Sequence, residues 1–382
     1  MNLLPLMLGL LAAFAPLAID MYLPALPAMA VSLGGDSGGA QLTIAAYFAG
    51  MAVGQLVYGP LTDRFGRKPP LFFGVGLFIM ASLACALAQS MPQMIALRLL
   101  QALGGCAGMV VARAVVRDVA HLRDPVRLMG RLMLIMGVAP ILAPSLGGVI
   151  DQFFGWRGIF LFLALFGGMA LLLVVLKLPE THPPERRMRQ NPAEVLGAYL
   201  GLLRDARFRR PALASGCAIA GLFAYIAGSP FVFMEVHGVA PQLYGLLFGV
   251  NAVGIIAGSQ ISGWAAERWG REALFSGMLW GMLAMAVALL LASGLGLPFW
   301  TVFLCLFLYI TLLGLVLPLG TVLGLAHFPQ LAGTASALMG TLQFGLGGVA
   351  GVVLGLWHDG SGVPMAVVIL GCILAANLAW RR

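Results

Sequence analysis

Charged residues are scarce in this chain of 382 residues. Asp, Glu, Lys and Arg together make up only 9% of it, whereas 61% of the residues are hydrophobic. Soluble domains carry about 25% charged residues, so the composition excludes a set of soluble domains and predicts a membrane protein. One crossing helix with its connection takes about 30 residues, so the length predicts about twelve crossings and leaves no room for a large soluble domain.

Several functional motifs are also missing. The five cysteines all fall in apolar runs and include no CxxC pair, so we expect neither a disulfide framework nor a zinc site. No GxxxxGKS or GxxxxGKT phosphate loop is present, which excludes this route to nucleotide-driven transport. The net charge of +8 is dispersed between apolar runs, whereas nucleic-acid binding needs a basic stripe. The N-terminus lacks the basic region of a signal peptide, so we expect it to be the first span.

Long unbroken apolar runs favour helices, because a membrane barrel would show short alternating segments. In the first half, residues 1–178, the expected spans are Leu3–Val31, Gln41–Leu61, Pro70–Ala88, Pro92–Val116, Leu128–Ile150 and Gly158–Leu178. In the second half, residues 211–382, they are Pro211–Glu235, Gln242–Ala265, Ala273–Ser293, Pro298–Ala326, Leu331–Trp357 and Val363–Trp380. Residues 179–210 form a polar linker, in which Asn191–Glu194 predicts the start of an amphipathic surface helix.

Lysine and arginine mark one side of the membrane. Of the 22 such residues, 20 lie in the linker, at the C-terminus or around the loops after spans two, four and eight. Arg157 lies in a loop on the other side, and Arg98 lies within span four. Cytoplasmic loops carry the excess of basic residues, so these loops and both termini are expected in the cytoplasm, with the protein in a bacterial-type inner membrane.

The sequence repeats itself with a shift of 204 residues. The stretch 59–68 reads GPLTDRFGRK and the stretch 263–272 reads GWAAERWGRE, so that glycine, acid, arginine, aromatic, glycine and arginine coincide. A shift of about six spans indicates two halves of the same topology, which commonly enclose a central cavity. The expected fold is therefore an all-α membrane protein with twelve transmembrane helices in two pseudo-symmetric six-helix bundles.

Four stretches resemble a known family. Residues 59–68 resemble motif A of the major facilitator superfamily, and residues 98–104, RLLQALG, resemble its motif B. Residues 144–148, PSLGG, resemble the end of its antiporter motif C. Residues 17–24, LAIDMYLP, are similar to the first-span signature of the bicyclomycin and chloramphenicol resistance exporters. The resemblance covers essentially the whole chain and implies a proton-coupled drug exporter.

Two isolated charges are the candidate proton-coupling residues. Asp20 is the only acid, and Arg98 the only basic residue, deep within a predicted span. An unpaired charge at that depth costs about 3 kcal/mol on insertion scales, so we expect the two side chains to share a cavity, with Arg98 as the partner of Asp20. Asp20 would then bind and release the proton. The alternative is a permanent ion pair that only fixes the helices.

The resemblance also implies a gate at the cytoplasmic ends of the helices. Charge-assisted hydrogen bonds between Asp63, Arg67 and Asp118 would close this side when the cavity opens outward. The alternative is that these charges only set the topology. Gly59 and Gly66 are expected to let the turn approach span eleven. The residues assigned to the gate are Gly59, Asp63, Arg64, Gly66, Arg67 and Asp118.

The second half has no deep charge, which suits a substrate held by aromatic rings and a few hydrogen bonds. The residues expected in the cavity, with packing between helices as the alternative for each, are Tyr22, Gln101, Tyr225, Asn251, Gln343 and Phe344. In span five, Pro144, Gly147 and Gly148 are expected to bend the helix where a rocking bundle needs it, unless the kink is an ordinary one.

These features together predict a monomeric exporter that exchanges protons for small amphipathic compounds by alternating access, with no cofactor, metal or nucleic-acid partner. A proton-coupled metabolite transporter, working in export or uptake, would use the same residues. A polytopic membrane enzyme is disfavoured because all five histidines fall in loops or at span ends. A channel is disfavoured because one acid and one arginine make no selectivity ring.

The distribution of basic residues predicts that Lys68 lies in the cytoplasm and that the turn from Asp151 to Arg157 lies outside. With the native cysteines replaced, a single cysteine at Gln152 should react with an impermeant thiol reagent in intact cells, and one at Lys68 should not. Strong labelling at Lys68 with none at Gln152 would refute this orientation.

Overall fold

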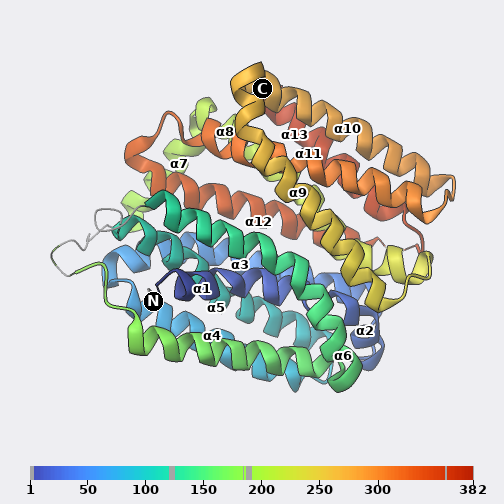
Figure 1. Cartoon of the computed structure of the whole chain (residues 1–382), viewed down its shortest axis with the longest axis horizontal. Coiled ribbons are helices and arrows are strands. Elements are labelled where there is room, and N and C mark those ends of the chain that lie inside the picture. Colours follow the sequence, from blue (N-terminus) through green and yellow to red (C-terminus); the bar gives the residue numbers. More distant parts are fainter. Residues whose placement is uncertain (1–3, 120–124, 184, 186–191, 358, 382) are drawn as a thin grey trace.

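The computed structural model describes residues 4–119, 125–183, 185, 192–357 and 359–381. These residues form two bundles of long helices that lie side by side (Figure 1). The helices of the first half and the linker are α1 Leu4–Asp20, η1 Leu23–Ala25, α2 Leu26–Ser32, α3 Ser37–Phe65, α4 Lys68–Ala86, α5 Met91–Asp118, α6 Pro125–Lys177 and α7 Pro192–Arg204. Those of the second half are α8 Ala206–Pro230, η3 Phe231–Val236, α9 Pro241–Trp269, α10 Arg271–Gly294, α11 Phe299–Leu325, η4 Pro329–Leu331, α12 Ala332–Leu356 and α13 Val363–Arg381.

Eleven helical stretches among the described residues are long and apolar enough to cross a membrane. One of them, Gly137–Lys177, has 41 residues, which is about 60 Å of helix and twice the thickness of a bilayer core. This stretch breaks at Gly155, whose φ of 68° and ψ of 176° lie outside the helical region. α6 therefore crosses the membrane twice, and the total of twelve crossings agrees with the sequence-based prediction.

Small residues bring the helices of each bundle into close contact. In α3, a Cβ atom added at Gly54 would lie 2.6 Å from Cys106 of α5. The residue 204 positions later, Gly258 of α9, packs in the same way, because its Cβ would lie 2.2 Å from the backbone carbonyl of Thr311 in α11. The repeat in the sequence therefore corresponds to a repeated helix pair, α3 with α5 and α9 with α11.

The first predicted span, Leu3–Val31, is not one continuous helix. α1 ends at Asp20, and the chain passes through the 3-10 turn η1 before it becomes helical again in α2. Pro24 within η1 lacks the backbone N–H that a continuing α-helix would need. As a result, Asp20 lies at the C-terminal end of a helix, where backbone carbonyl groups lack partners within the helix.

The two bundles meet along two seams, where α3 packs against α12 and α6 packs against α9. Both seams are tight at the end of the molecule that we predict to lie outside. A Cβ atom at Gly38 of α3 would lie 2.3 Å from the carbonyl oxygen of Gly355 in α12. On the other seam, a Cβ atom at Gly245 of α9 would lie 3.0 Å from the backbone nitrogen of Ser145 in α6. The outer ends of the bundles are therefore in direct contact.

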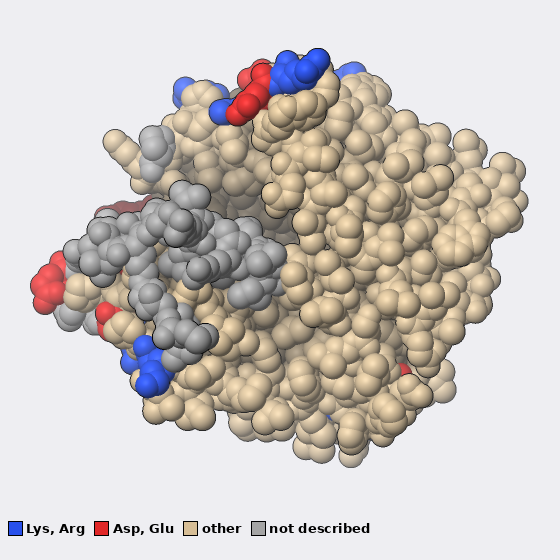
Figure 2. Space-filling model, in the orientation of Figure 1, with Lys and Arg blue, Asp and Glu red and all other residues tan. Residues whose placement is uncertain are grey.

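Figure 2 shows a broad face with almost no charged side chains, and most of the visible Lys, Arg, Asp and Glu side chains lie in two groups, at its top and left edges. Such a face suits contact with lipid. The surface is hollowed between the two bundles, in the region between these two groups of charged side chains (Figure 2). The bundles are therefore in contact at the end that we predict to lie outside, and the surface between them is hollowed towards the end that we predict to lie in the cytoplasm.

The linker contains the amphipathic helix that the sequence predicts from Asn191–Glu194, and it runs from Pro192 to Arg204 as α7. Leu202 of α7 is buried in a small apolar cluster with Phe208 of α8 and Leu338 of α12. Leu196, on another face of α7, is exposed. One face of the linker helix is therefore packed against the second bundle.

Gly147 of α6 offers a test of this packing, because a Cβ atom there would lie 1.7 Å from the carbonyl oxygen of Met21. We expect Gly147→Ala to lower the free energy of unfolding by about 1–3 kcal/mol, because the backbone must move to make room. The measurement is thermal unfolding of the purified protein. The matched control is Gly168→Ala in the same helix, where a Cβ atom would meet nothing within 4 Å. Equal melting temperatures for the two variants would contradict this packing.

Candidate functional site

A fully buried arginine cluster lies inside the first bundle. The guanidinium group of Arg98 donates one hydrogen bond to the amide oxygen of Gln101 and another, of 2.9 Å, to the backbone carbonyl of Ala18. Its central carbon lies 4.3 Å from the ring centroids of both Tyr22 and Tyr47. These aromatic faces stabilise a cation that has no carboxylate partner among the described residues. We call these five residues the arginine cluster.

Two of the predicted cavity residues, Gln101 and Tyr22, belong to this cluster. The amide nitrogen of Gln101 donates to the hydroxyl of Ser82 in α4 at 2.8 Å, which fixes the orientation of the amide. The hydroxyl of Tyr22 lies 3.1 Å from the hydroxyl of Thr43 in α3. Both side chains are buried and hydrogen-bonded within the first bundle, so their geometry suits the positioning of Arg98.

The structure does not pair Asp20 with Arg98, in contrast to the sequence-based expectation. No ion pair joins the two within the described residues, and one carboxylate oxygen of Asp20 is buried without a hydrogen-bond partner. The physical reason is that the arginine is already bound to Gln101 and to the carbonyl of Ala18, two residues before Asp20. Asp20 is only 4% exposed and lies within electrostatic range of Tyr225 and Tyr244 in the second bundle.

Polar side chains of α8 and α9 form the second-bundle side of this region. The amide nitrogen of Asn251 donates to the hydroxyl of Tyr225 at 2.9 Å, so these two predicted cavity residues are brought together. The amide oxygen of Asn251 is buried without a partner in the described part of the chain. Tyr244 is hydrogen-bonded to Ser229 at 3.0 Å. The region between Asp20 and Asn251 thus contains two buried acceptor oxygens that no described side chain satisfies.

An aromatic stack crosses the seam between the bundles. Phe48 of α3 lies 4.2 Å from Phe223 of α8, measured between ring centroids, and Phe223 lies 5.4 Å from Phe344 of α12. Phe344 was predicted in the cavity, and its ring takes part in this stack. Gln343, which precedes Phe344 in α12 and was also expected in the cavity, is half-buried. The stack therefore joins α3 of the first bundle to α8 and α12 of the second.

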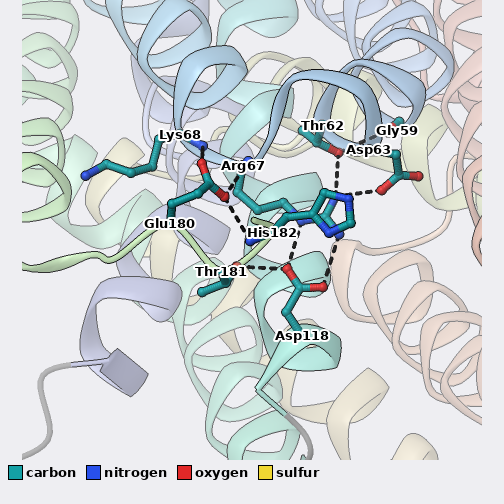
Figure 3. A network of polar contacts seen from close by, with 9 residues as sticks. All are labelled: Gly59, Thr62, Asp63, Arg67, Lys68, Asp118, Glu180, Thr181 and His182. Carbon is teal, nitrogen blue, oxygen red and sulfur yellow. Dashed lines mark hydrogen bonds and ion pairs between the residues drawn. The ribbon is translucent and has the colours of Figure 1, made fainter. Parts of the chain in front are cut away.

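The charge cluster expected at the cytoplasmic ends is formed, with Arg67 at its centre (Figure 3). Arg67 donates to Asp63 at 2.6 Å and to the two carboxylate oxygens of Asp118 at 2.9 and 3.1 Å. It also reaches the hydroxyl of Thr62 at 3.3 Å. The arginine is buried, so these charge-assisted bonds lie in surroundings where they are strong.

The segment after α6 completes this network, and sequence reasoning missed it. The carboxylate of Glu180 accepts hydrogen bonds from the backbone N–H groups of Arg67 and Lys68 at 2.9 and 3.1 Å, and so caps the start of α4 (Figure 3). The hydroxyl of Thr181 donates to Asp118 at 2.8 Å. The only signal in the sequence was an acid and a hydroxyl placed directly after span six, on the same side of the membrane as Asp118.

The hydrogen bonds of the network shift the pKa values of Asp118 and Arg67. Burial alone would raise the pKa of the Asp118 carboxyl, but hydrogen bonds from Arg67 and Thr181 outweigh it, so the pKa of Asp118 lies below its usual value. Burial alone would lower the pKa of Arg67, but its bonds to Asp118 and Asp63 raise it instead. Both groups therefore stay charged at neutral pH.

The other residues assigned to the gate lie at the edge of the network. Gly66 ends α3 with a φ of 90°, a conformation that favours glycine. A Cβ atom at Gly59 would meet nothing within 4 Å, so the expected close approach of span eleven is absent at this described position. Arg64 is exposed and lies over the ring of Phe65. All the hydrogen bonds described above for the network join residues of the first half and the start of the linker.

The stretch that resembles motif C lies at the outer seam. α6 contacts both η1 and α9, and α9 also contacts η1. Gly147 faces the backbone of Met21, and Gly148 lies near Pro24 and the carbonyl of Pro241. Pro144 lies within the same helix. These residues therefore hold the broken end of the first span against the second bundle.

The sequence matches the family model of the Major Facilitator Superfamily over residues 8–352. It is 36% identical to the "Uncharacterized MFS-type transporter YdgK" of Bacillus subtilis (strain 168), covering 98% of this chain and 93% of that protein. It is 29% identical to the "Bicyclomycin resistance protein homolog" of Haemophilus influenzae, covering 98% and 94%. It is 31% identical to "Multidrug resistance protein D" of Escherichia coli (strain K12), again covering 98% and 94%.

Among solved structures, the nucleoside transporter NupG superposes with a TM-score of 0.74 over 100% of this chain and 98% of that one. Its sequence identity is 16%, so this likeness concerns the fold alone. No group of three or more His, Cys, Asp and Glu side chains that could hold a metal ion occurs among the described residues.

The network predicts an order of stability among variants. Asp118 accepts three side-chain hydrogen bonds and its side chain is 13% exposed, whereas Asp63 accepts one and is 40% exposed. We therefore expect Asp118→Asn to lower the melting temperature at pH 7 more than Asp63→Asn does.

The lowered pKa of Asp118 fixes how this effect depends on pH. Its stabilisation is complete above the pKa of the unfolded chain, about 3.9, and is lost as the pH falls through the lower pKa of the folded state. The melting temperatures of wild type and Asp118→Asn should therefore differ at pH 6–8 and converge below about pH 4. A difference that stays constant down to the acid range would contradict this pairing.

Proposed function

The chain belongs to the major facilitator superfamily, and we propose that it exports small amphipathic compounds in exchange for protons by alternating access. It is a multi-pass membrane protein whose family and fold are those of transporters. The relatives named for bicyclomycin and multidrug resistance support drug-like compounds as its substrates. We place it in the inner membrane of a bacterium as a monomer with cytoplasmic termini, driven by the proton gradient and without a cofactor.

The observation that carries this proposal is the position of Asp20. It is a buried acid at the broken end of α1, it has no ion-pair partner among the described residues, and it lies within range of tyrosines in the second bundle. An ionised carboxylate is costly in such surroundings, and protonation removes that cost. A movement of the bundles that admits water or substrate to Asp20 therefore changes its affinity for a proton.

Arg98 serves this step indirectly. Its bond to the carbonyl of Ala18 holds the last turn of α1, and the two tyrosine rings hold the guanidinium group in place. Because these contacts hold the guanidinium group and no ion pair joins it to Asp20 among the described residues, Arg98 does not neutralise Asp20 in the closed-outside state. We assign Asp20 as the proton carrier, Arg98 as the residue that positions it, and Tyr225 with Asn251 as the facing wall of the substrate region.

We assign the network around Arg67 to the step of alternating access in which the cytoplasmic side closes. Its hydrogen bonds stiffen the ends of α3, α4 and α5 as one unit. Asp63 is more exposed than Asp118 and lies within electrostatic range of Tyr199 in the linker helix. We propose that the network becomes a latch when the cytoplasmic ends approach one another, with Asp63 facing the groups that arrive from the linker and the second bundle.

A proton-coupled metabolite transporter is the second candidate function. It would use the same acid and the same network, and the aromatic stack at the seam favours the drug-like class over polar metabolites. Transport by proteoliposomes of a panel of compounds that includes bicyclomycin and polar metabolites separates the two candidates.

Asp20→Asn tests the coupling directly. The amide resembles the protonated carboxyl in shape, so the variant should fold and can still bind a compound. It should lose uphill export driven by a pH gradient and should release no proton when the compound binds. In the wild type, binding should release a proton, or weaken as the pH falls because proton and compound compete.

The measurement is proton release from purified protein together with uphill export in sealed vesicles. The matched control is Asp36→Asn, because Asp36 caps α3 outside the membrane and an asparagine caps a helix equally well. It should behave as wild type in both assays. Undiminished proton release and export by Asp20→Asn would remove the main support for antiport.

A further inference from the structure

A small groove with a cavity volume of about 30 Å³ lies at the outer end of the molecule, away from the site described above. Gln41 of α3 lines it from the first bundle. Glu235 of η3, Trp357 after α12 and Ser361 before α13 line it from the second bundle. We call these four residues and the space between them the outer groove. The outer groove lies across the α3–α12 seam. Gln41 is three residues after Gly38, which packs against the backbone of Gly355.

One polar atom of the outer groove is a buried hydrogen-bond acceptor without a donor among the described residues. Gln41 is only 3% exposed, and its amide oxygen has no hydrogen-bond partner in the described part of the chain. An acceptor that is buried and unsatisfied favours any ligand that brings an N–H or O–H group. Glu235 adds an exposed carboxylate to the same wall.

The remaining lining strengthens the preference for a cation. The hydroxyl of Ser361 donates to the carboxylate of Asp359 at 2.7 Å and accepts from the backbone of Val363 at 3.1 Å, so a second negative charge lies next to the groove. Trp357 also lines the groove, and aromatic rings attract cations. Among the described residues that line this groove there is no lysine, arginine or histidine. The electrostatics and the free acceptors therefore agree on one class of ligand.

The local backbone is built to leave this space. α8 does not continue regularly past Pro230, and the next six residues form the π-helix Phe231–Val236. Such π-helical turns are rare and frequently occur at functional sites. This turn carries Glu235, which lines the groove together with Gln41 of α3.

We propose that the outer groove binds a protonated alkylamine from the outer side of the membrane. The ammonium N–H groups donate to the Glu235 carboxylate and to the Gln41 amide oxygen at once, and the alkyl chain lies along Trp357. Since Gln41 and Glu235 belong to different bundles, the site is complete only while the outer ends are in contact. Occupancy therefore favours the state that is closed to the outside.

The test measures binding and not transport, so its result does not depend on whether the proposed export function is correct. Purified full-length protein is titrated with n-butylammonium by calorimetry at pH 7 and low salt. Wild type should bind it saturably. Glu235→Gln should weaken binding at least tenfold and Gln41→Leu at least threefold. The matched control is Glu272→Gln, an exposed acid at the start of α10, which should bind as wild type does.

A second probe and a distance measurement separate this site from unspecific attraction of cations. n-Butyltrimethylammonium keeps the charge and the chain but has no N–H donor, and it should bind at least threefold more weakly. Spin labels at Val31→Cys and Leu295→Cys, both exposed near the outer ends of different halves, should report a larger closed population when n-butylammonium is added. That change should be absent in Glu235→Gln.

Glu235 is on the surface, so its variant keeps the test decisive even if Gln41→Leu does not fold. Absence of saturable binding to wild type would overturn the proposal, and so would equal affinity of wild type and Glu235→Gln. Equal binding of the two ammonium probes would also overturn it, because the free acceptors would then play no part.

Discussion

One buried cation, the guanidinium group of Arg98, sets the arrangement around it. A charge in an apolar bundle must find partners, and this one takes the amide oxygen of Gln101, the carbonyl of Ala18 and two tyrosine rings. The carbonyl is available because α1 ends two residues later. The break in the first span and the burial of the arginine therefore depend on each other, and together they leave Asp20 without a fixed counter-charge.

This division of roles distinguishes two kinds of charge in the protein. Arg67 and Asp118 are joined by several short hydrogen bonds, and Arg98 is held by two hydrogen bonds and two tyrosine rings, although its Nε has no partner among the described residues. These three groups are suited to hold helices in place. Asp20 and Asn251 keep buried acceptor atoms without partners, on opposite sides of the seam. Atoms of the second kind are the ones whose energy changes most when the bundles move, because water or a ligand can reach them in one state and not in another. The fixed charges thus make the changes at Asp20 possible.

The sequence predicted the number of crossings, the two halves and the linker helix, because apolar length, the repeat and amphipathic periodicity are local signals. It also predicted that Asp63, Arg67 and Asp118 would meet, since they lie at helix ends on one side of the membrane. It failed at the partner of Arg98, because the choice between Asp20 and the carbonyl of Ala18 depends on a helix break that no apolar run shows. It missed Glu180 for a related reason: the bonds to the start of α4 span more than 110 residues of chain.

The central claim is that Asp20 is the group that gains and loses a proton within the membrane. Infrared difference spectroscopy between alkaline and acidic pH tests it most directly, with the purified protein in lipid vesicles. The account predicts that the wild type gains the carbonyl band of a protonated, poorly hydrated carboxyl group as the pH falls, and that Asp20→Asn lacks this band. The same band in Asp20→Asn, or no such band in the wild type at any pH, would contradict it.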